Sequence, residues 1–253
     1  TIEKLASMYN FNLDYENTDE KKQDTKILEE VNKYYQKLFV YNENVKEYIS
    51  KRGISEFSIE KFEIGYAPIS IDTINFLKSN HYNLTDAIDL GVIDNGTNGL
   101  YSRFIERITF PIYSITGKLV GFGGRTITGH NAKYVNSPQT KLFNKSRLLY
   151  GYHLAKEQIY KKNQIIVCEG YLDVIMLHQA GFNTAVATLG TALTTEHLPL
   201  LRRGDPKVIL AYDGDKAGLA AAFKASVMLS QSEFEGGVII FADGLDPADM
   251  VHN

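Results

Sequence analysis

Acidic side chains follow three short apolar segments in the last third of the sequence. In chain order these side chains are Glu169, Asp213, Asp215, Asp246 and Asp249. Each apolar segment has the length of a buried strand, and the carboxyl ends of the strands in an open parallel sheet form the edge where ligands bind. Because grouped carboxylates repel one another unless a cation neutralises them, the pattern predicts a divalent metal ion held for phosphoryl transfer.

The densest of these motifs is Asp213-Gly214-Asp215. Residues two apart in an extended segment point to the same side, so both carboxylates can bind one Mg²⁺ ion, and Gly214 would let backbone or a phosphate group come close. A simple turn is the structural alternative, since Asp-Gly is common in turns, and it would be favoured for an isolated motif. The two further acid-terminated segments favour the metal site.

Two acids surround the start of a predicted helix, Glu169 before Gly170 and Asp173 four residues after Glu169. Both could simply cap that helix, where negative charge is favoured. The functional alternative makes Glu169 a metal ligand or a general base near an attacking hydroxyl, with Asp173 supporting the ligands. The pattern favours the functional role for Glu169 and leaves both roles open for Asp173.

The net charge of −3 conceals a strong asymmetry along the chain. Residues 1–100 carry 11 Lys and Arg against 17 Asp and Glu, residues 101–150 carry 8 against 1, and residues 151–253 carry 8 against 12, which gives −6, +7 and −4. Most charged stretches are simply solvated surface. Here the central basic residues are interleaved with Gly, Asn, Tyr and Phe, which favours contact with a nucleic acid or a nucleotide.

The composition excludes several classes of protein. With 253 residues, 44% hydrophobic and 23% charged, the sequence is typical of a soluble globular protein. A single cysteine, Cys168, excludes an internal disulfide and a cysteine-rich zinc site. The apolar segments are too short to span a membrane, and no signal peptide is visible. Since the sequence starts at Thr1 and stops shortly after Asp249, we expect a fragment whose carboxyl-terminal helical part is missing.

Apolar spacing divides the chain into two expected regions, a basic mixed α/β subdomain over residues 1–160 and a metal-binding subdomain over residues 163–253. In the first, residues 1–40 form a helical and linker lead-in with a polar loop at 14–24, followed by helices expected over 25–39, 44–52, 58–62 and 71–80 and strands over 107–113 and 118–122. In the second, strands over 165–168, 184–188, 207–212 and 237–241 alternate with helices over 171–180, 194–202 and 216–230, before a terminal acidic loop. This order predicts an α/β fold, with a parallel sheet flanked by helices and preceded by a mixed α+β subdomain.

Short motifs in both regions resemble those of a known family. Four segments resemble motifs of the TOPRIM domain, namely E-G-Y-L-D-V (169–174), A-T-L-G-T (187–191), Y-D-G-D-K-A-G (212–218) and D-G-L-D-P-A-D (243–249). Six segments further upstream resemble motifs of the catalytic core of bacterial DnaG-type primases, in the same order. They are K-R-G-I-S (51–55), I-G-Y-A-P (64–68), R-F-I-E-R-I-T-F-P-I (103–112), G-F-G-G-R (121–125), K-Y-V-N-S-P (133–138) and L-F-N-K-S (142–146). TOPRIM alone is shared with topoisomerases and nucleases, whereas the upstream motifs are much more specific.

The resemblance implies roles for the acids. Glu169, Asp213 and Asp215 would be catalytic and would bind two or more Mg²⁺ ions, for which Mn²⁺ can substitute. Asp246 corresponds to the first acid of the family's last motif, which is often D-P-D and would supply a further metal ligand. This sequence has Ala248 at the third position and Asp249 next, so Asp249 is a weaker candidate that either turns inward as a replacement or caps a helix.

For the basic block, the resemblance implies a groove beside the metal site that is lined by Arg52, Arg125, Lys133 and Lys145. The residue types agree, because Arg offers a planar fork for phosphate oxygens. Gly123 and Gly124 remove side chains just before Arg125, so a phosphate could approach the backbone there, although a tight strand connection would explain them equally.

Further candidates for nucleotide or template contact lie around these cations. Tyr134 and Asn136 add a stacking surface and a polar group next to Lys133, although an aromatic residue at a strand-like position is commonly part of a core. Arg103 and Arg107 rank lower, since pairing with Glu106 or with the acidic amino-terminal region would also explain them. Binding of single-stranded template fits this mixture, because cations follow the backbone and stacking tolerates any base.

The resemblance implies a DNA-dependent RNA polymerase that makes short RNA primers on single-stranded DNA during replication. Its expected partners are the DNA template, ribonucleoside triphosphates, the nascent RNA primer and a replicative helicase reached through a domain outside this chain, in the bacterial cytoplasm at the replication fork and without a membrane. The zinc-binding domain of the family cannot lie in a chain with one cysteine. Two alternatives stay open, a TOPRIM nuclease or topoisomerase fragment and an inactive, metal-dependent module that binds single-stranded nucleic acid.

Overall fold

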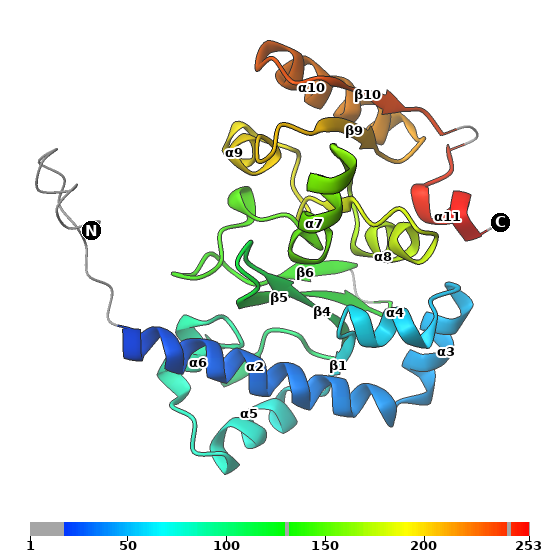
Figure 1. Ribbon diagram of the computed structural model, residues 1–253. Coiled ribbons are helices and arrows are strands. Elements are labelled where there is room, and N and C mark those ends of the chain that lie inside the picture. The colour runs from blue at the N-terminus through cyan, green and yellow to red at the C-terminus, as the bar shows by residue number, and fades with distance from the viewer. Residues whose placement is uncertain (1–17, 130–131, 242–243, 253) are drawn as a thin grey trace, which may run out of the picture.

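The computed structural model describes residues 18–129, 132–241 and 244–252 (Figure 1). Two four-stranded sheets lie one above the other in that view, with helix α8 (Tyr171–Gln179) between them. Every residue of α8 from Tyr171 to His178 is buried, which is the pattern of a helix covered on all sides. The two sheets share one apolar core, in which the Phe110 ring stacks on the Tyr171 ring with centroids 5.0 Å apart.

The amino-terminal sheet is antiparallel, in the order β1-β4-β5-β6. Its strands are β1 (Gly65–Ala67), β4 (Arg107–Tyr113), β5 (Leu119–Thr126) and β6 (Tyr134–Asn136). A separate hairpin pairs β2 (Ile93–Gly96) with β3 (Gly99–Ser102). β4 and β5 are buried at all but their last positions, so they form the centre of this half. The turn between them contains Gly117 at φ 80°.

The amino-terminal half also contains helices. In the described residues they are α2 (Thr18–Val40), α3 (Glu43–Lys51), α4 (Glu56–Lys61), α5 (Ser70–Ser79) and α6 (Leu84–Asp89). Asn42 and Ser55 cap the starts of α3 and α4, because each side chain accepts a hydrogen bond from a backbone N–H in the first turn, at 3.2 Å in both cases. Gly53, at φ 72°, ends α3 as predicted.

The second sheet is parallel throughout, in the order β10-β9-β7-β8. Its strands are β7 (Gln164–Cys168), β8 (Ala185–Ala187), β9 (Lys207–Ala211) and β10 (Gly236–Ile239). Its other helical segments are η1 (Lys145–Arg147), α7 (Tyr152–Lys162), η2 (Thr195–His197), α9 (Leu198–Leu201), α10 (Lys216–Gln231) and α11 (Pro247–His252). Because all four strands run in one direction, their carboxyl ends meet at one edge, and the predicted α/β fold is confirmed.

The structure differs from three expectations for local structure. The loop predicted over 14–24 is wrong from Thr18 onward, where α2 begins, because Lys, Glu and Gln have good helix propensity; residues 14–17 lie outside the described residues. The helix predicted over 194–202 is divided into η2 and α9, because Pro199 has no N–H to continue a helix from the preceding turn. The terminal acidic loop contains α11, since Pro247 is suited to a first helical position.

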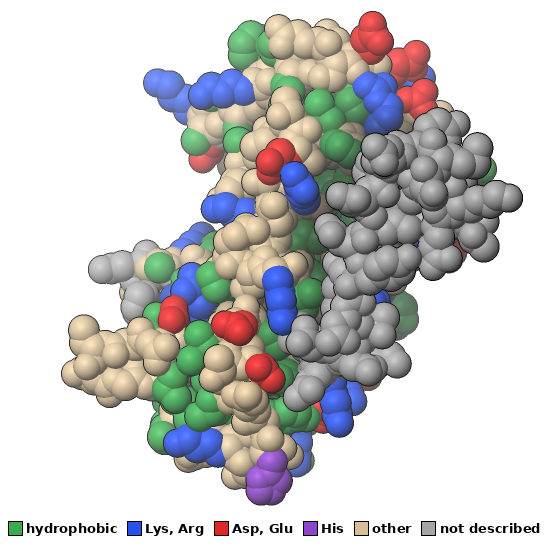
Figure 2. Space-filling model, turned by 90° about the vertical axis from the view of Figure 1, so that its left-hand side faces the viewer, with side chains coloured by type: hydrophobic (Ala, Val, Ile, Leu, Met, Phe, Trp, Pro, Cys, Tyr) green, Lys and Arg blue, Asp and Glu red, His purple; other side chains and the backbone are tan. Residues whose placement is uncertain are grey.

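The surface seen in Figure 2 carries Lys and Arg side chains interspersed with Asp and Glu. No large area of one sign is visible among the coloured side chains on this face, which is the ordinary arrangement of a solvated surface. The charge asymmetry of the sequence therefore has to be sought elsewhere on the molecule. Within the described part of the chain, no helix is long and apolar enough to cross a lipid bilayer.

Candidate active site

A cleft of about 350 Å³ opens where the carboxyl edge of the parallel sheet meets the amino-terminal half. The predicted residues that line it are Arg52, Arg125, Lys133, Tyr134, Asn136, Glu169, Asp173, Asp213 and Asp246. The predicted residues outside its lining are Arg103, Arg107, Lys145, Asp215 and Asp249. The fold thus brings acids and cations from distant parts of the chain to a single cavity.

Glu169 directly follows β7, and the end of that strand places its half-buried side chain at the cleft. Burial, followed by the negative charges of Asp213 and Asp215, raises the pKa of Glu169 to about 7. The ionised form of Glu169 is therefore disfavoured by its surroundings. A cation bound nearby would restore it.

Asp213 owes its position to the glycine that follows it. The N–H of Gly214 donates to the Leu245 carbonyl oxygen at 2.9 Å, and a Cβ atom at Gly214 would lie 2.5 Å from the Phe241 carbonyl oxygen. Only glycine allows this approach, which brings the segment after β9 against the segment after β10. Burial, and after it the charge of Asp246, raises the pKa of Asp213. The group that lies close to Gly214 is therefore the backbone of the segment after β10.

Asp215 has a different environment from Asp213. Its exposed side chain accepts a hydrogen bond from the Gly218 N–H at 2.7 Å and so caps the start of α10. Gly218 is required for this turn, because a Cβ atom there would lie 2.2 Å from the Asp213 carbonyl oxygen. The two acids of the motif therefore do not both face the cleft, and Asp215 stands at its rim.

Asp173 combines two roles that the sequence left open. Its carboxylate accepts a hydrogen bond from the Gly170 N–H at 2.9 Å and caps α8, and the side chain is only 7% exposed. Burial, followed by the charges of Asp246 and Asp213, raises the pKa of Asp173 to about 8. Asp173 is thus a capping residue that also faces the cleft.

The last acidic motif forms the start of α11. The Asp249 N–H donates to the Asp246 carboxylate at 2.7 Å, and the Asp246 N–H donates back to the Asp249 carboxylate at 3.5 Å. This reciprocal pattern is a capping box, and it holds Asp249 at the exposed side of the helix. Ala248 takes the place beside the cleft and packs against the shared core.

The carboxylates that line the cleft at the carboxyl edge of the parallel sheet, called the acidic edge below, are potential ligands of a metal ion. The acids that line the cleft, Glu169, Asp173, Asp213 and Asp246, are hard oxygen ligands, and their mutual effect on pKa shows negative charge that protein cations do not neutralise. Among the described residues, no three His, Cys, Asp or Glu side chains are arranged to hold a metal ion by themselves. This donor set fits Mg²⁺, which keeps several waters and is bound by one or two carboxylates together with substrate phosphates.

Three cations that line the cleft form what we call its basic wall, namely Arg52, Arg125 and Lys133. Arg125 is the centre of this wall. Its guanidinium carbon lies 5.1 Å from the ring centroids of both Tyr48 and Tyr134, and its Nη1 donates to the Tyr134 hydroxyl. Arg52, the residue that ends α3, lies over the same Tyr48 ring at 5.7 Å. Aromatic rings thus hold two of the predicted cations.

The glycines before Arg125 do not leave the open space for a phosphate that the sequence suggested. A Cβ atom at Gly123 would lie 2.3 Å from the Tyr171 ring, and one at Gly124 would lie 2.7 Å from the Phe104 ring. Aromatic side chains therefore fill the space that a phosphate would need. The expectation of phosphate approach was wrong because β5 is buried between these rings.

Asn136 and Lys133 both line the cleft, but hydrogen bonds hold the Asn136 side chain and the Lys133 side chain is exposed. The Asn136 Nδ2 donates to the Leu189 carbonyl oxygen at 2.8 Å, and the Tyr171 hydroxyl donates to the Asn136 Oδ1 at 2.5 Å. Asn136 therefore ties the two halves of the molecule together. Lys133 is exposed, and its charge partly counteracts the rise in the pKa of Asp213.

The cations outside the cleft have other partners. Arg107 is 4% exposed and donates to the carbonyl oxygens of residues 132 and 133 at 2.8 and 3.3 Å, so it binds backbone rather than Glu106. Arg103 pairs with Asp94 of the acidic amino-terminal region at 3.9 Å. Lys145 is exposed on η1, beyond the lining of the cleft.

Two tyrosines of this site were missed in the sequence. Tyr48 precedes Arg52 by one helical turn, and this spacing was the available signal, since residues four apart lie on one face of a helix. Tyr171 meets Asn136 across 35 residues of sequence, and no local pattern indicates that contact.

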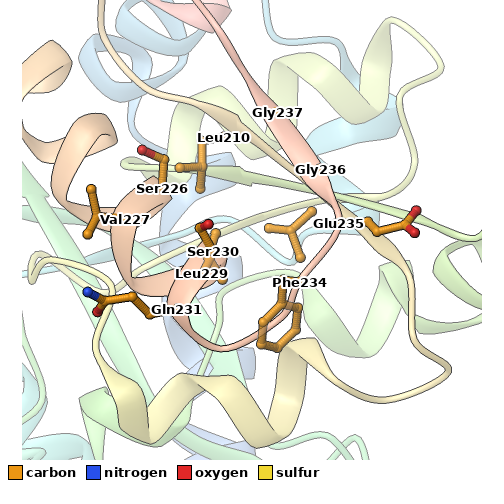
Figure 3. A pocket seen from close by; sticks show the side chains of 11 residues that line it. Leu210, Ser226, Val227, Leu229, Ser230, Gln231, Phe234, Glu235, Gly236 and Gly237 are labelled. Carbon is orange, nitrogen blue, oxygen red and sulfur yellow. The ribbon is translucent and has the colours of Figure 1, made fainter.

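A second hollow of about 450 Å³ lies between α10 and β10 (Figure 3). Apolar side chains and small hydroxyl groups line it, and in the part of the chain that the structure describes Glu235 is its one ionisable lining residue. Glu235 pairs with Lys207 at 3.6 Å and points outward in the close-up. Because no acids or cations converge on this hollow, it lacks the chemistry of the cleft.

Comparison with known families agrees with this geometry. Residues 34–156 match the family described as the DNA primase catalytic core, N-terminal domain, and residues 163–240 match the Toprim domain. The DNA primase of Helicobacter pylori (strain ATCC 700392 / 26695) is 52% identical over 256 residues, which cover 100% of this chain and 45% of that protein. The DNA primase of Campylobacter jejuni is 48% identical over 254 residues, covering 99% and 42%. The chain thus spans less than half the length of these curated relatives.

Solved structures give the same result at the level of the fold. The RNA polymerase domain of Mycobacterium tuberculosis primase DnaG superposes with a TM-score of 0.83 at 32% identity, covering 90% of this chain and 78% of that one. The DnaG primase catalytic domain bound to ssDNA superposes with a TM-score of 0.84 at 35% identity, covering 93% and 76%. With a cleft of this composition and relatives of this similarity, the chain belongs to the family of bacterial DnaG-type DNA primases and covers about three quarters of their solved catalytic domains.

Proposed function

We propose that this chain is a DNA-dependent RNA polymerase core that synthesises short RNA primers on single-stranded DNA from ribonucleoside triphosphates. The observation that carries the proposal is the cleft, in which an acidic sheet edge faces a wall of arginine and lysine side chains. Joining nucleotides needs both, because a metal-binding edge and a phosphate-binding wall must act on the same triphosphate. The relatives support this activity, since they are DNA primases and one of them is a catalytic domain bound to ssDNA.

In this proposal the acidic edge binds the metal. Glu169, Asp213 and Asp246 line the cleft as ligands, and Asp215 joins them from the rim by turning its exposed side chain away from the helix cap. Two or more Mg²⁺ ions, for which Mn²⁺ could substitute, would be held by these carboxylates and would supply activation of the primer hydroxyl and neutralisation of charge on the departing pyrophosphate. The alternative role for Glu169 is that of a general base, which accepts the proton of the attacking hydroxyl.

The basic wall binds phosphate groups. Arg52 and Arg125 present planar guanidinium groups to a triphosphate, and Lys133 adds an exposed cation near the acids. Tyr134, which is 37% exposed, offers a ring face on which a base can stack. Lys145 extends the path of positive charge beyond the cleft for the template backbone.

The remaining partners follow from this activity. The template, the ribonucleoside triphosphates and the nascent primer meet in the cleft, and the replicative helicase binds through a part of the primase that this chain does not contain. We place the protein in the bacterial cytoplasm at the replication fork. A core without the zinc-binding domain of its family should start primers with reduced sequence preference.

A synthesis assay with labelled ribonucleotides, single-stranded DNA and Mg²⁺ tests the proposal. The chain should make short RNA, and Asp213→Asn should abolish that synthesis. Asp205→Asn is the matched control, because Asp205 is an exposed acid paired with Arg202 at 3.7 Å and lies outside the lining of the cleft. Cleavage of the DNA without RNA synthesis would instead support a nuclease. Binding of DNA without either reaction would support an inactive binding module.

A further inference from the structure

The basic wall depends on a side chain that does not itself line the cleft. Tyr48 lies on α3, one turn before Arg52, and the Arg52 guanidinium carbon is 5.7 Å from the centroid of its ring. Arg125, from β5 in the antiparallel sheet, approaches the same ring at 5.1 Å. One aromatic ring therefore contacts two cations that come from separate elements of the fold.

Two guanidinium groups repel one another, so their convergence needs an opposing interaction. The negative face of an aromatic ring attracts a guanidinium group, and Tyr48 offers this attraction to both arginines. Tyr134 holds Arg125 from a second direction, at 5.1 Å, and accepts a hydrogen bond from its Nη1. Arg125 is thus fixed between two rings, and Arg52 contacts one of these two rings.

The contact with Tyr48 is made by the ring rather than by the hydroxyl group. Among the described residues, the buried Tyr48 hydroxyl has no hydrogen-bond partner. The Arg125 Nε is likewise buried without a partner. The ring alone is therefore expected to set the position of the guanidinium groups, and phenylalanine should serve as well as tyrosine at this position.

We infer that Tyr48 is a positioning residue for phosphate recognition, which holds Arg52 and Arg125 side by side so that a polyphosphate anion can bind both. This inference rests on the proposed function, because it gives the arginine pair the triphosphate of the nucleotide as its ligand. Tyr48 acts through the arginines and does not touch the ligand. Its loss should weaken binding of the triphosphate without removing any group from the acidic edge.

The test measures binding of inorganic tripolyphosphate in the absence of metal and the KM for ATP during primer synthesis. Tyr48→Leu should weaken tripolyphosphate binding and raise the KM for ATP by about five- to thirtyfold, the range that two cation–π contacts allow, with little change in kcat. Tyr48→Phe should stay within about twofold of the parent protein in both measurements. Tyr34→Leu is the control, because Tyr34 stacks on Phe76 at 4.2 Å and does not line the cleft, so that variant should lose stability alone.

A double-mutant cycle with Arg125→Lys separates positioning from a general loss of structure. Once Arg125 is replaced, Tyr48→Leu should have a much smaller effect on tripolyphosphate binding, since it acts through that arginine. Additive effects, or a Tyr48→Leu variant that binds as tightly as the parent, would overturn the inference. If Tyr48→Leu does not fold, Tyr48→Met carries the same expectations, because its longer, flexible side chain can fill the space of the ring in a different way.

The outcomes for the inference and for the proposed function are distinguishable. Weaker binding by Arg125→Ala together with unchanged binding by Tyr48→Leu and Tyr48→Met would reject the role of Tyr48 and leave the proposed function intact. Unchanged binding by Arg125→Ala would reject the triphosphate site of the basic wall, and the inference with it.

Discussion

The two walls of the cleft are built in opposite ways. The acidic edge places its carboxylates at strand ends, where burial and the charges of Asp213 and Asp246 raise the pKa of neighbouring acids. The basic wall holds Arg125 between two aromatic rings and shares one of these rings with Arg52. The acids are thus compensated only in part, by Lys133, whereas aromatic rings of the protein itself hold the arginines.

This difference indicates how the two walls contribute to function. An edge of mutually repelling acids is completed by a cation that arrives from solution, so its stability depends on that cation. A wall held by rings and hydrogen bonds is arranged before any ligand binds, so its geometry is a fixed property of the fold. Substitutions on the two walls should therefore have opposite consequences for stability.

The largest effect is expected on the acidic edge. Glu169→Gln should lower the rate of primer synthesis at least about a hundredfold, because it removes an electrostatic contribution from the reacting centre. Without divalent cations, its free energy of unfolding should be equal to or higher than that of the parent, since one repelling charge is gone. Synthesis assays and chemical denaturation measure the two quantities. Glu196→Gln, an exposed acid on η2, is the control. A Glu169→Gln variant that is both active and less stable would remove the contrast between the walls.

The pH dependence of stability should report the burial of these acids and, after it, their mutual repulsion. Folded pKa values lie above those of the unfolded chain, about 8 against 3.8 for Asp173 and about 7 against 4.5 for Glu169. The stabilising contribution of the protonated forms is present below the unfolded values and is lost as the pH rises through the folded values. Without divalent cations, denaturation should therefore show the free energy of unfolding falling from about pH 4 to about pH 8, by an amount on the order of a few kcal/mol.

Mg²⁺ and Asp173→Asn should each make this pH profile flatter. Mg²⁺ does so by binding the ionised edge, and Asp173→Asn by removing a proton-binding group. Asp205→Asn should keep the slope of the parent. A profile that stays equally steep in all these conditions would locate the titration elsewhere in the protein.

A third effect should appear behind the basic wall. Arg107→Met should lower the free energy of unfolding by about 2–3 kcal/mol, because the carbonyl oxygens of residues 132 and 133 lose a charged donor. It should also weaken template binding, since Lys133 would lose the support of its backbone. Denaturation and DNA titration check the two effects. Arg147→Met, on the exposed side of η1, is the control. Unchanged stability would mean that these hydrogen bonds contribute nothing to the wall.

The acidic edge could be predicted from the sequence because topology alone creates it. Once β7, β9 and β10 are known to run parallel, the residues after them must meet at one edge, whatever their side chains. Their individual environments could not be predicted in the same way. The capping role of Asp215 and the outward turn of Asp249 depend on the first turns of α10 and α11, where a helix start competes with the cleft for the same carboxylate.

The basic wall was predictable in composition and not in detail. The cation-rich block indicated phosphate binding, but Arg107 and Arg103 are occupied by partners that come from other segments. The short strands β1, β2, β3 and β6 were missed because three or four residues show no periodicity. Helix α7 was missed although its buried positions have helical spacing.

The smallest effect is expected at Lys133, whose exposed cation is the part of the basic wall least fixed by the protein. Lys133→Ala should weaken binding of single-stranded DNA about three- to fivefold at low salt and reduce the slope of log affinity against log salt by about 0.7, the value for one phosphate contact on a single strand. Lys118→Ala is the matched control, because Lys118 is an exposed lysine at the turn before β5 and does not line the cleft. Because a lysine that is merely solvated releases no counterion from the DNA, an unchanged slope in Lys133→Ala would show that this end of the wall is ordinary surface and that phosphate recognition is confined to the arginine pair.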